Sequence, residues 1–486
     1  MKTLKKPLGL SLGFFAKKED CHKLLRPLQK RAVEFVCERE ASALLFKQRL
    51  GKTYITAGVI ERLRPQRTLL IVPLNNRDST WLKKLRELVP HIPRCHTTRK
   101  GRKSSVAALQ GFTSGVFVTH IEQFCSLAKL LRRREWDLIV VDEAHRAKDR
   151  ASLFARRLAM MRHSPAKKLI LTGTAIEEEP QDLWAQFKFL DDEVFGDSWK
   201  DFEGEFMEPL EEFDWKKWGR MKGSMRFKRA LMKHRIAQNR RGFDFDKLRD
   251  FIARIKDHCW YEELPGAKPA FHRIYVDMFG GQRRAYQQLE KKGVLELDNG
   301  VVITPQNKAA KQIKLRQLTS GFIYDEDKNV HWVGKAKLSR LMVLIRKIPR
   351  PLPIFCLYVP EIEVLREILP GRVKELYGAT PREERPKIQE AFQRGGVDYL
   401  ICQTRTGGVG IDLYRAKNLI VLSSNYSSID FDQLINRIRL PDQTEPVNIF
   451  LIIVEGTIDD SRTGDVFRKN RRVSEVLSQL RRSENG

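Results

Sequence analysis

Short, continuous runs of apolar residues recur along this chain, and each run is stopped by polar or turn-forming residues. Runs of this length are typical of strands that are buried on both faces, as in parallel sheets. Amphipathic segments of helix length separate them, such as ITAGVIERL and PREERPKIQEAFQRG. Because strand and helix alternate, the pattern predicts two doubly wound α/β lobes. The runs of the first lobe are TLLIVP (68–73), VFVTH (116–120), LIVVDEAH (138–145) and KLILTGT (168–174), and those of the second are PIFCLYV (353–359), YLICQT (399–404), LIVLSSN (419–425) and NIFLIIVE (448–455).

The middle of the chain breaks this alternation. Residues 193 to about 265 lack strand-like runs and are rich in Phe, Trp, Lys and Arg, and the part at 215–241 is basic with helix-like apolar spacing. A strand-like segment at 271–278 follows, and then more helical sequence. We therefore expect a first lobe over residues 1–192, a helical basic protrusion over 193–265, a second lobe over 266–470 with a helical insertion at about 280–334, and a basic tail over 471–486.

The tripeptide Gly51-Lys52-Thr53 lies between the apolar run SALLF and a helical stretch, which is the strand–loop–helix context of a phosphate-binding loop. In such a loop, backbone N–H groups and the helix N-terminus hold phosphate oxygens, the lysine neutralises the β and γ phosphates, and the threonine hydroxyl ligates Mg²⁺. Phe46 and Arg49 stand where glycines are common, so the tripeptide alone also fits an ordinary polar helix start. The nucleotide-binding residues expected here are Arg49, Leu50, Gly51, Lys52, Thr53 and Tyr54.

The tetrad Asp142-Glu143-Ala144-His145 directly follows a predicted strand. Ligands of open α/β sheets bind at the carboxyl ends of the strands. We expect Asp142 to hold Mg²⁺ and Glu143 to polarise the attacking water, for in-line phosphoryl transfer to water. An acidic pair can also cap a helix, but capping does not explain the whole tetrad. Thr172-Gly173-Thr174 follows the next strand run, and the order of the three elements predicts a nucleotide-hydrolysing site.

The second lobe supplies two further elements. A glycine-rich loop at 403–413 leaves a strand run, and we expect its Gly410 and Asp412 to approach the nucleotide. The segment FDQLINRIRLPDQ (431–443) contains Arg437 and Arg439. An arginine here can reach the γ-phosphate across the cleft between the two lobes. Arginine suits this task because its planar guanidinium is always charged. A surface arginine on a helix is the alternative interpretation.

These elements in this order resemble helicase superfamily two, and in detail its Swi/Snf-type branch of double-stranded DNA translocases. The resemblance runs from about residue 24 to 460. It implies two RecA-like parallel-sheet lobes with helical insertions, a DNA-dependent ATPase of the DEAH-box type that uses ATP and Mg²⁺, an adenine contact by Gln29, and Trp81 in the place of the family's tryptophan. The segments that carry it are LLRPLQKRAV (24–33), VPLNNRDSTWLKKL (72–85), VVDEAHRAKD (140–149), LTGTAIEEEPQDLWAQFKFL (171–190), IKLRQLTSG, GKAKLSRL, YGATPREERPKIQEAF, TGGVGIDL and VEGTIDD.

The chain departs from the family pattern at three positions. Arg49 replaces the first glycine of the usual GLGKT form, where a bulkier residue can narrow the loop or contact phosphate, and Ala175 replaces a common proline. The family's last motif has two arginines three residues apart. Arg437 fits the first place, but the second holds Leu440, and the nearest arginine is Arg439. A one-residue slip on a helix turns a side chain by roughly 100°, so Arg437 is the stronger candidate, and Arg439 reaches the phosphate only if the local backbone adjusts.

The formal net charge of +29 predicts a polyanionic partner, and nucleic acid is the default candidate. Nonspecific polyanion binding is the alternative. Contacts to the phosphate backbone are independent of sequence and sensitive to salt, which suits a motor on double-stranded or branched DNA. We expect such contacts from Thr119, Thr404 and Arg405. The stretch at 215–241, with Trp215 and Trp218, is either another contact or a solvated helical face with core tryptophans.

Three functions remain open at this point. The first is an ATP-driven translocase that moves along or remodels duplex DNA, and the second is a helicase that separates strands of DNA or RNA. The third is a basic nucleic-acid-binding scaffold whose ATPase has decayed. Phe46, Arg49 and the irregular arginine spacing favour the scaffold, whereas intact Lys52 and Asp142 argue against it.

Other features bound the setting in which the protein works. The seven cysteines form no Cys-x-x-Cys pair, so we expect reduced thiols and no zinc site. The first residues lack the cleavage site of a targeting segment, and no apolar run has the length of a membrane span. The motifs fill nearly the whole chain. We therefore expect a compact, monomeric protein of the cytoplasm, from a bacterium or from a phage-infected host.

Overall fold

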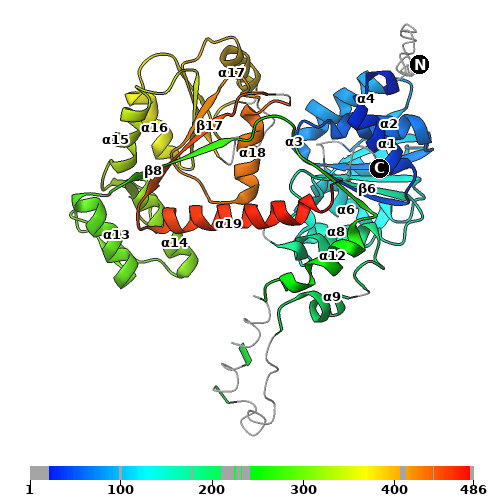
Figure 1. Ribbon diagram of the computed structural model, residues 1–486, viewed down its shortest axis with the longest axis horizontal. Helices are drawn as coiled ribbons and strands as arrows, with labels where there is room; N and C mark the ends of the chain where they lie inside the picture. The colour runs from blue at the N-terminus through cyan, green and yellow to red at the C-terminus, as the bar shows by residue number, and fades with distance from the viewer. Residues whose placement is uncertain are drawn as a thin grey trace, which may run out of the picture.

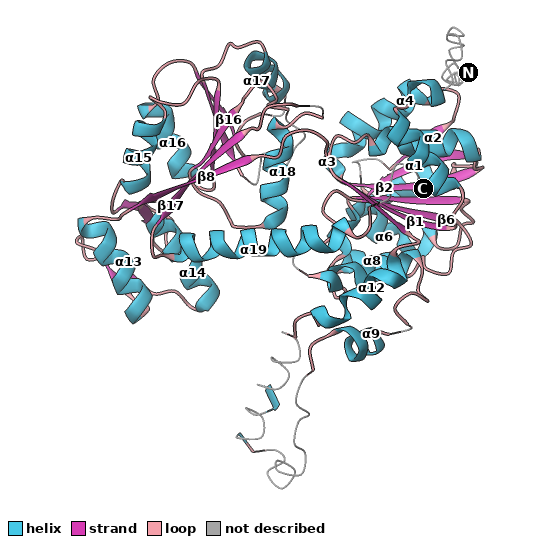
Figure 2. Cartoon of the chain, in the orientation of Figure 1, coloured by secondary structure: helices cyan, strands magenta, loops and turns pink. Residues whose placement is uncertain are grey.

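The computed structural model contains two α/β lobes that lie side by side, each with a parallel sheet covered by helices (Figure 1). This is the fold class that the alternation of apolar runs predicts. The long helix α19 (Ile458–Ser478) runs across from the second lobe to the first, and α18 (Ser428–Ile438) lies on the side of the second lobe that faces the first (Figure 2). The structure describes residues 21–97, 101–176, 179–196, 198–209, 224–225, 231–232, 241–381, 383–404, 412–441 and 443–481.

The sheet of the first lobe has seven strands in the order β3-β4-β2-β5-β6-β1-β7, and all neighbours are parallel. Successive side chains of each central strand enter opposite cores, so both faces of the sheet are buried. Every run predicted for this lobe forms a strand. The strands are β1 (Ala41–Phe46), β2 (Arg67–Val72), β3 (Arg94–His96), β4 (Gly115–His120), β5 (Leu138–Asp142), β6 (Lys167–Leu171) and β7 (Cys259–Glu262).

Helices and short helical turns cover both faces of this sheet. They connect the strands as crossovers, which parallel neighbours require. The α-helices are α1 (Pro27–Cys37), α2 (Lys52–Leu63), α3 (Leu74–Asn76), α4 (Lys83–Leu88), α5 (Arg102–Gln110), α6 (Ile121–Leu131), α7 (Leu153–Ala159), α8 (Trp184–Leu190), α9 (Trp199–Phe206) and α12 (Leu248–Ile255), and the turns are η1 (Cys21–Leu24), η2 (Arg77–Leu82), η3 (Ala144–Ala147), η4 (Pro180–Leu183) and η5 (Phe245–Lys247).

The sheet of the second lobe has six parallel strands in the order β14-β15-β13-β16-β17-β8. It also has a separate core on each face. Its strands are β8 (Ala270–Val276), β13 (Leu352–Cys356), β14 (Val373–Leu376), β15 (Tyr399–Gln403), β16 (Asn418–Val421) and β17 (Asn448–Val454), and its helices besides α18 and α19 are α15 (Ala336–Leu344), α16 (Val359–Ile368) and α17 (Glu384–Gln393).

An insertion with a small core of its own follows β8. The sequence predicts helical structure here, and the structure adds two short antiparallel hairpins to the two helices. The elements of the insertion are α13 (Gly280–Lys292), β9 (Leu295–Glu296), β10 (Val302–Ile303), α14 (Lys308–Thr319), β11 (Phe322–Tyr324) and β12 (Val330–Trp332).

The lobe boundaries in the structure differ from the sequence-based boundaries in two places. Strand β7 lies within the segment assigned to the protrusion, yet it pairs with β1 as the edge strand of the first sheet. Helix α19 passes without a break through residue 470, where we expect the second lobe to end, and Val476 and Leu477 pack in the core of the first lobe. Both differences arise because β7 and the end of α19 are stabilised by partners that are distant in the sequence.

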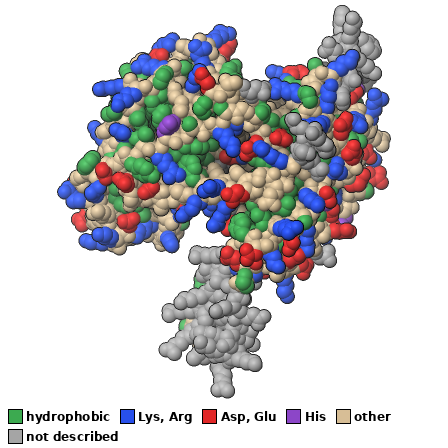
Figure 3. All heavy atoms as spheres, in the orientation of Figure 1, with side chains coloured by type: hydrophobic (Ala, Val, Ile, Leu, Met, Phe, Trp, Pro, Cys, Tyr) green, Lys and Arg blue, Asp and Glu red, His purple; other side chains and the backbone are tan. Residues whose placement is uncertain are grey.

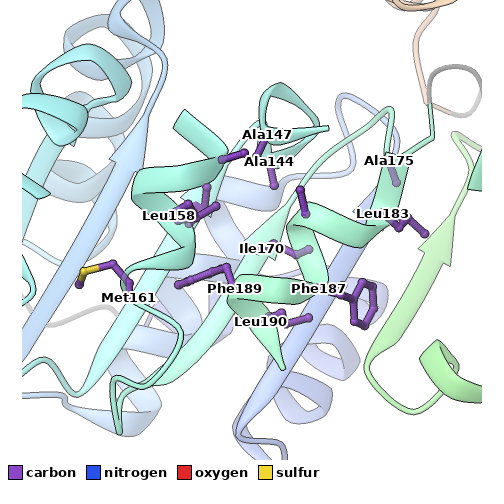
Figure 4. Close-up of a cluster of buried hydrophobic side chains, with 14 of the residues drawn as sticks. Ala144, Ala147, Leu158, Met161, Ile170, Ala175, Leu183, Phe187, Phe189 and Leu190 are labelled. Atoms are coloured by element: carbon purple, nitrogen blue, oxygen red, sulfur yellow. The ribbon is translucent and has the colours of Figure 1, made fainter. Parts of the chain in front are cut away.

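A buried cluster supports the acidic tetrad of the first lobe. Ala144 and Ala147, in the turn η3 after β5, pack with Leu158 and Ile170 in the hydrophobic core beside the sheet (Figure 4). These small residues bring the turn close to α7 and α8. The packing therefore fixes the backbone from which the two carboxylates of the tetrad project.

The surface is rich in basic side chains. Lys and Arg are spread over the visible face of both lobes, with acidic side chains between them (Figure 3). The positive charge is therefore not gathered in one small patch on this face. In the part of the chain that the structure describes, no helix is both long enough and apolar enough to cross a membrane.

Candidate active site between the lobes

The phosphate loop leaves the carboxyl end of β1 and enters α2 at Gly51, whose φ is 84°. No side chain caps this helix, so its first N–H groups are available to an anion. Lys52 Nζ donates to the carbonyl oxygens of Phe46, at 2.7 Å, and Lys47, at 3.5 Å. The ammonium group thus lies in the curve of the loop, where the sequence predicts the β and γ phosphates.

Gln29 braces this loop from α1. Its Oε1 accepts from the backbone N–H of Arg26 at 3.0 Å, and its Nε2 donates to the carbonyl oxygen of Leu50 at 3.1 Å. A Cβ on Gly51 would lie 2.1 Å from Gln29 Nε2. Glycine is therefore required at this position twice, for its positive φ and for the close approach of the glutamine. The Leu50 side chain is buried in the core, and Lys84 lies over the ring of Tyr54.

The Asp142 carboxylate is held by Trp81. Its Oδ2 accepts from Trp81 Nε1 at 2.8 Å, and its Oδ1 accepts from the backbone N–H of Glu143 at 3.0 Å. Trp81 is buried and belongs to the π-helical turn η2. Burial and the Glu143 carboxylate raise the pKa of Asp142, and burial lowers the pKa of Lys52. Asp142 and Lys52 are both poorly solvated, so a cation bound at Asp142 and a polyphosphate bound at Lys52 would each be stabilised by an opposite charge.

Glu143 sits in the left-handed region, with a φ of 53°. The distance from Glu143 Oε2 to His145 Nδ1 is 3.3 Å. Burial acts to raise the pKa of Glu143, but the His145 imidazole and the Lys52 ammonium outweigh it and lower that pKa. Glu143 therefore stays ionised near neutral pH, as a group that polarises water must.

His145 also joins the acidic tetrad to the Thr-Gly-Thr element. Its Nδ1 lies 3.0 Å from the hydroxyl oxygen of Thr172, which is fully buried. The same hydroxyl oxygen accepts from the backbone N–H of Thr174 at 3.1 Å. Strand β6 lies between β5 and β1, so the Thr-Gly-Thr turn is placed between the tetrad and the phosphate loop.

Two basic side chains of the phosphate loop reach the second lobe. Lys47 Nζ lies 2.5 Å from Asp432 Oδ2 on α18. Arg49 has a φ of 70° and is ion-paired with Asp412, and its Nη2 also donates to the carbonyl oxygen of Arg437 at 2.9 Å. Burial lowers the pKa of Arg49, and Asp412 opposes this effect. Sequence patterns contain no signal for the pair of Lys47 with Asp432.

The two candidate arginines of the last motif occupy different surroundings. Arg437 is buried near the end of α18, beside the residues that meet the phosphate loop. Arg439 follows the helix, and its Nη2 donates to the carbonyl oxygens of Leu264 at 2.8 Å and Gly266 at 3.0 Å. These carbonyls belong to the linker between β7 and β8. Arg439 thus holds the linker, whereas the backbone of Arg437 contacts the phosphate loop.

The residues expected to contact nucleic acid are only partly described. Thr119 is fully buried, and its hydroxyl lies 3.4 Å from that of Thr97. Thr404 is buried and donates to the carbonyl oxygen of Cys356 at 3.0 Å. In this arrangement neither hydroxyl is open to a phosphate group. Arg405, Gly410, and most of residues 215–241 with Trp215 and Trp218, lie outside the described residues.

Two further observations concern possible metal sites and cavities. Among the described residues, no group of three or more His, Cys, Asp or Glu side chains is placed to hold a metal ion. A cavity of about 1500 Å³ lies in the second lobe, between α13, α14 and α19, and none of the residues of the candidate site lines it.

Two protein-family models match this chain. The model described as SNF2-related domain matches residues 28–320, and the model described as Helicase conserved C-terminal domain matches residues 336–439. The first match includes Lys52, Asp142 and Glu143, and the second includes Arg437. The two halves of the site therefore fall in the two matched regions.

Curated relatives cover most of the chain at low identity. A probable ATP-dependent DNA helicase, CHR12, of Arabidopsis thaliana is 25% identical over 440 residues, which is 85% of this chain and 38% of the relative. The chromatin structure-remodeling complex subunit snf21 of Schizosaccharomyces pombe is 25% identical over 446 residues, which is 85% of this chain and 35% of the relative. This chain thus spans little more than a third of the length of these relatives.

A phage protein of similar length also matches. The putative protein p41 of Acyrthosiphon pisum secondary endosymbiont phage 1 is 24% identical over 465 residues, which is 90% of this chain and 94% of the relative. Among solved structures, a Sulfolobus solfataricus SWI2/SNF2 ATPase core in complex with dsDNA is 19% identical, with 94% of this chain and 96% of that chain covered and a TM-score of 0.39.

Proposed function

The chain belongs to the SNF2-related family, as its motifs predict, and from this premise we propose that it is an ATP-dependent motor. It hydrolyses ATP and uses the energy to move along, or remodel, duplex or branched DNA. One observation carries the proposal. Lys52, Asp142 and Glu143 gather at the carboxyl ends of β1 and β5, two strands of one sheet with β6 between them, and the backbone of Arg437 on the other lobe contacts the phosphate loop.

The residues present fit ATP. The uncapped N-terminus of α2 offers N–H groups to phosphate oxygens, and Lys52 supplies the compensating charge from within the loop. Phosphate would replace the two carbonyl oxygens as the partner of the Lys52 ammonium. Arg49, Leu50, Gly51 and Tyr54 belong to the phosphate loop and the start of α2, and Gln29, which braces this loop, would contact adenine.

Thr53 and Asp142 would hold Mg²⁺ together with phosphate oxygens and water, a ligand set that this ion prefers. When bound, the ion neutralises charge on the β and γ phosphates. The buried Asp142 carboxylate, oriented by Trp81, is the chain's main anion for this purpose. We expect Gly410 and Asp412, in the glycine-rich loop of the second lobe, to approach the nucleotide.

Hydrolysis depends on two further side chains. Glu143 is ionised and accepts a hydrogen bond from the attacking water, which orients the water in line with the γ-phosphate. Arg437 stabilises the charge that develops on the transferred phosphoryl group. Because these residues come from different lobes, the site is complete only when the lobes are close together. ATP binding therefore favours closure, and product release favours opening.

DNA binding in this proposal depends on the net charge of +29 and on backbone contacts from both lobes, with Arg405 and Thr404 as candidates. Thr119 and Thr404 contribute only if their buried hydroxyls become exposed. We further propose that the protein acts as a monomer in the cytoplasm of a bacterium or of a phage-infected cell. The similarity to a phage protein of matching length motivates this setting.

The test is the steady-state ATPase rate without nucleic acid and with linear duplex DNA, single-stranded DNA, RNA or a four-way junction. Glu143→Gln serves as the blank. We expect strong stimulation by duplex or junction DNA and little by single strands. Stimulation mainly by single strands would instead support a strand-separating helicase. No turnover with any of them would contradict the proposal and leave the scaffold with a decayed ATPase.

A further inference from the structure

Arg49 occupies a backbone position that suits glycine. Its φ is 70°, a region that disfavours any residue with a Cβ. Strained positions of this kind persist where the surrounding structure uses them. Only 17% of the Arg49 side chain is exposed, and the side chain leaves the phosphate loop toward the second lobe. The backbone at this position favours glycine, so we look to the contacts of the Arg49 side chain for the reason that an arginine is present.

The Arg49 guanidinium contacts two segments of the second lobe at once. It is ion-paired with Asp412, and its Nη2 donates to the carbonyl oxygen of Arg437 at 2.9 Å. The same carbonyl oxygen accepts from the backbone N–H of Leu413 at 2.9 Å. One side chain thus joins the phosphate loop to the end of α18 and to the segment that packs against this end.

We propose that Arg49 is a positioning residue that couples the phosphate loop of the first lobe to the arginine finger of the second. This inference rests on the proposed function, because it takes Arg437 as the residue that meets the γ-phosphate. Arg49 is two residues from Gly51 and holds the backbone of Arg437 itself. A shift of the loop when nucleotide binds is therefore transmitted directly to the residue that completes the site.

A direct contact between Arg49 and the nucleotide is the competing role. In this structure both contacts of Nη2 are made with the second lobe, so a phosphate contact would require the guanidinium to leave Asp412 and Arg437. The pair of Lys47 with Asp432 crosses between the same two elements and supports the same placement of the lobes. The two roles differ in the kinetic constant that they affect.

The kinetic test compares Arg49→Gly, Asp412→Asn and the double variant with wild type under saturating duplex DNA. Glycine removes the side chain and also relieves the positive φ, so strain cannot explain a loss of activity. We expect kcat to fall about tenfold in each single variant, with the KM for ATP changed less than about threefold. The double variant should lose no more than Arg49→Gly alone, because that substitution already removes the pair with Asp412. Lys417→Gln, in the exposed pair with Glu445, is the matched control.

Hydrogen exchange without nucleotide or DNA tests the contact independently of activity. In Arg49→Gly we expect faster exchange in peptides that contain Leu413 and residues 437–440, and unchanged exchange in β4. Unchanged exchange at these peptides would overturn the proposal, as would a kcat within about twofold of wild type. A rise of about tenfold in KM at constant kcat would make Arg49 a phosphate ligand instead. If wild type hydrolyses no ATP, the proposed function fails, and the exchange data alone decide whether Arg49 couples the lobes.

Discussion

An ion pair lies deep inside the second lobe, where three helices meet. Lys337 Nζ is 2.5 Å from Asp459 Oδ2, and the two side chains are only 1% and 2% exposed. Lys337 also donates to the carbonyl oxygen of Leu422 at 3.1 Å, and Asp459 Oδ1 accepts from the hydroxyl of Thr319 at 2.9 Å. The pair thus joins the end of α14, the start of α15 and the start of α19.

Lys337→Met keeps a long apolar side chain but removes the cation and leaves the Asp459 carboxylate unpaired. Breaking one side of a buried pair costs about 3–5 kcal/mol, because a charge remains in a poorly solvated place. With a urea dependence of about 2–3 kcal/mol per M, the unfolding midpoint of the second lobe should fall by roughly 1–2.5 M. Hydrogen exchange in a urea series measures this, since its peptides report the two lobes separately.

Two further variants test whether the unpaired carboxylate causes the loss of stability. Lys337→Met/Asp459→Leu removes both charges and should recover part of the loss, because the unpaired carboxylate is gone. Lys417→Gln breaks an exposed pair, with side chains 69% and 67% accessible, and should cost at most about 1 kcal/mol. A midpoint for Lys337→Met no lower than that of Lys417→Gln would refute the argument, and so would a double variant as unstable as the single one.

Three other predictions concern the active site and pH. Glu143→Gln should lower the kcat for ATP by about 10²–10⁴-fold while a fluorescent ATP analogue binds within about threefold of wild type, and a similar loss of binding would contradict its role. Arg437→Ala should lower kcat by about 10³-fold or more. Arg439→Ala leaves the linker carbonyls without their donor, so it should lower the free energy of unfolding by about 1–3 kcal/mol, measured by thermal unfolding, and kcat by less than about tenfold. Equal losses of kcat in the two variants would show that both arginines reach the phosphate. The Arg372 guanidinium and backbone N–H lower the pKa of Asp398 to about 2. The stabilising contribution of the Asp398 carboxylate is therefore present above about pH 4 and is lost as pH falls from there through about 2. Urea unfolding at pH 6 and pH 3 should show a loss of stability in Asp398→Asn that is smaller at pH 3, and an equal loss at both pH values would exclude this linkage.

Local patterns predict much of the fold because they depend only on neighbouring residues. The apolar runs that end at Val72, Asp142 and Leu171 are buried strands, because their alternating side chains enter two cores. Strand β7, with the sequence CWYE, has no such run and is a strand only because β1 pairs with it. The length and the apolar content of the CWYE segment do not indicate that it pairs with β1.

The candidate site divides in the same way. The sequence predicts that Lys52, Asp142 and Glu143 follow strands, and parallel strands end at one edge of a sheet, so their convergence is determined by the fold class. It also restricts the arginine finger to Arg437 or Arg439. It does not reveal that Trp81 orients Asp142, because these residues are 61 positions apart and meet only in the folded lobe.

The sequence by itself determined the two parallel-sheet lobes, the order of the phosphate loop and the acidic tetrad, and the family. Only the tertiary structure decided which arginine lies beside the loop, what Arg49 contacts, and where α19 ends. Lys47 and Asp432 are 385 positions apart, and Arg49 and Asp412 are 363 apart. Such pairs depend on how two separately folded lobes are placed, and this placement is set by packing between distant segments that no local periodicity encodes.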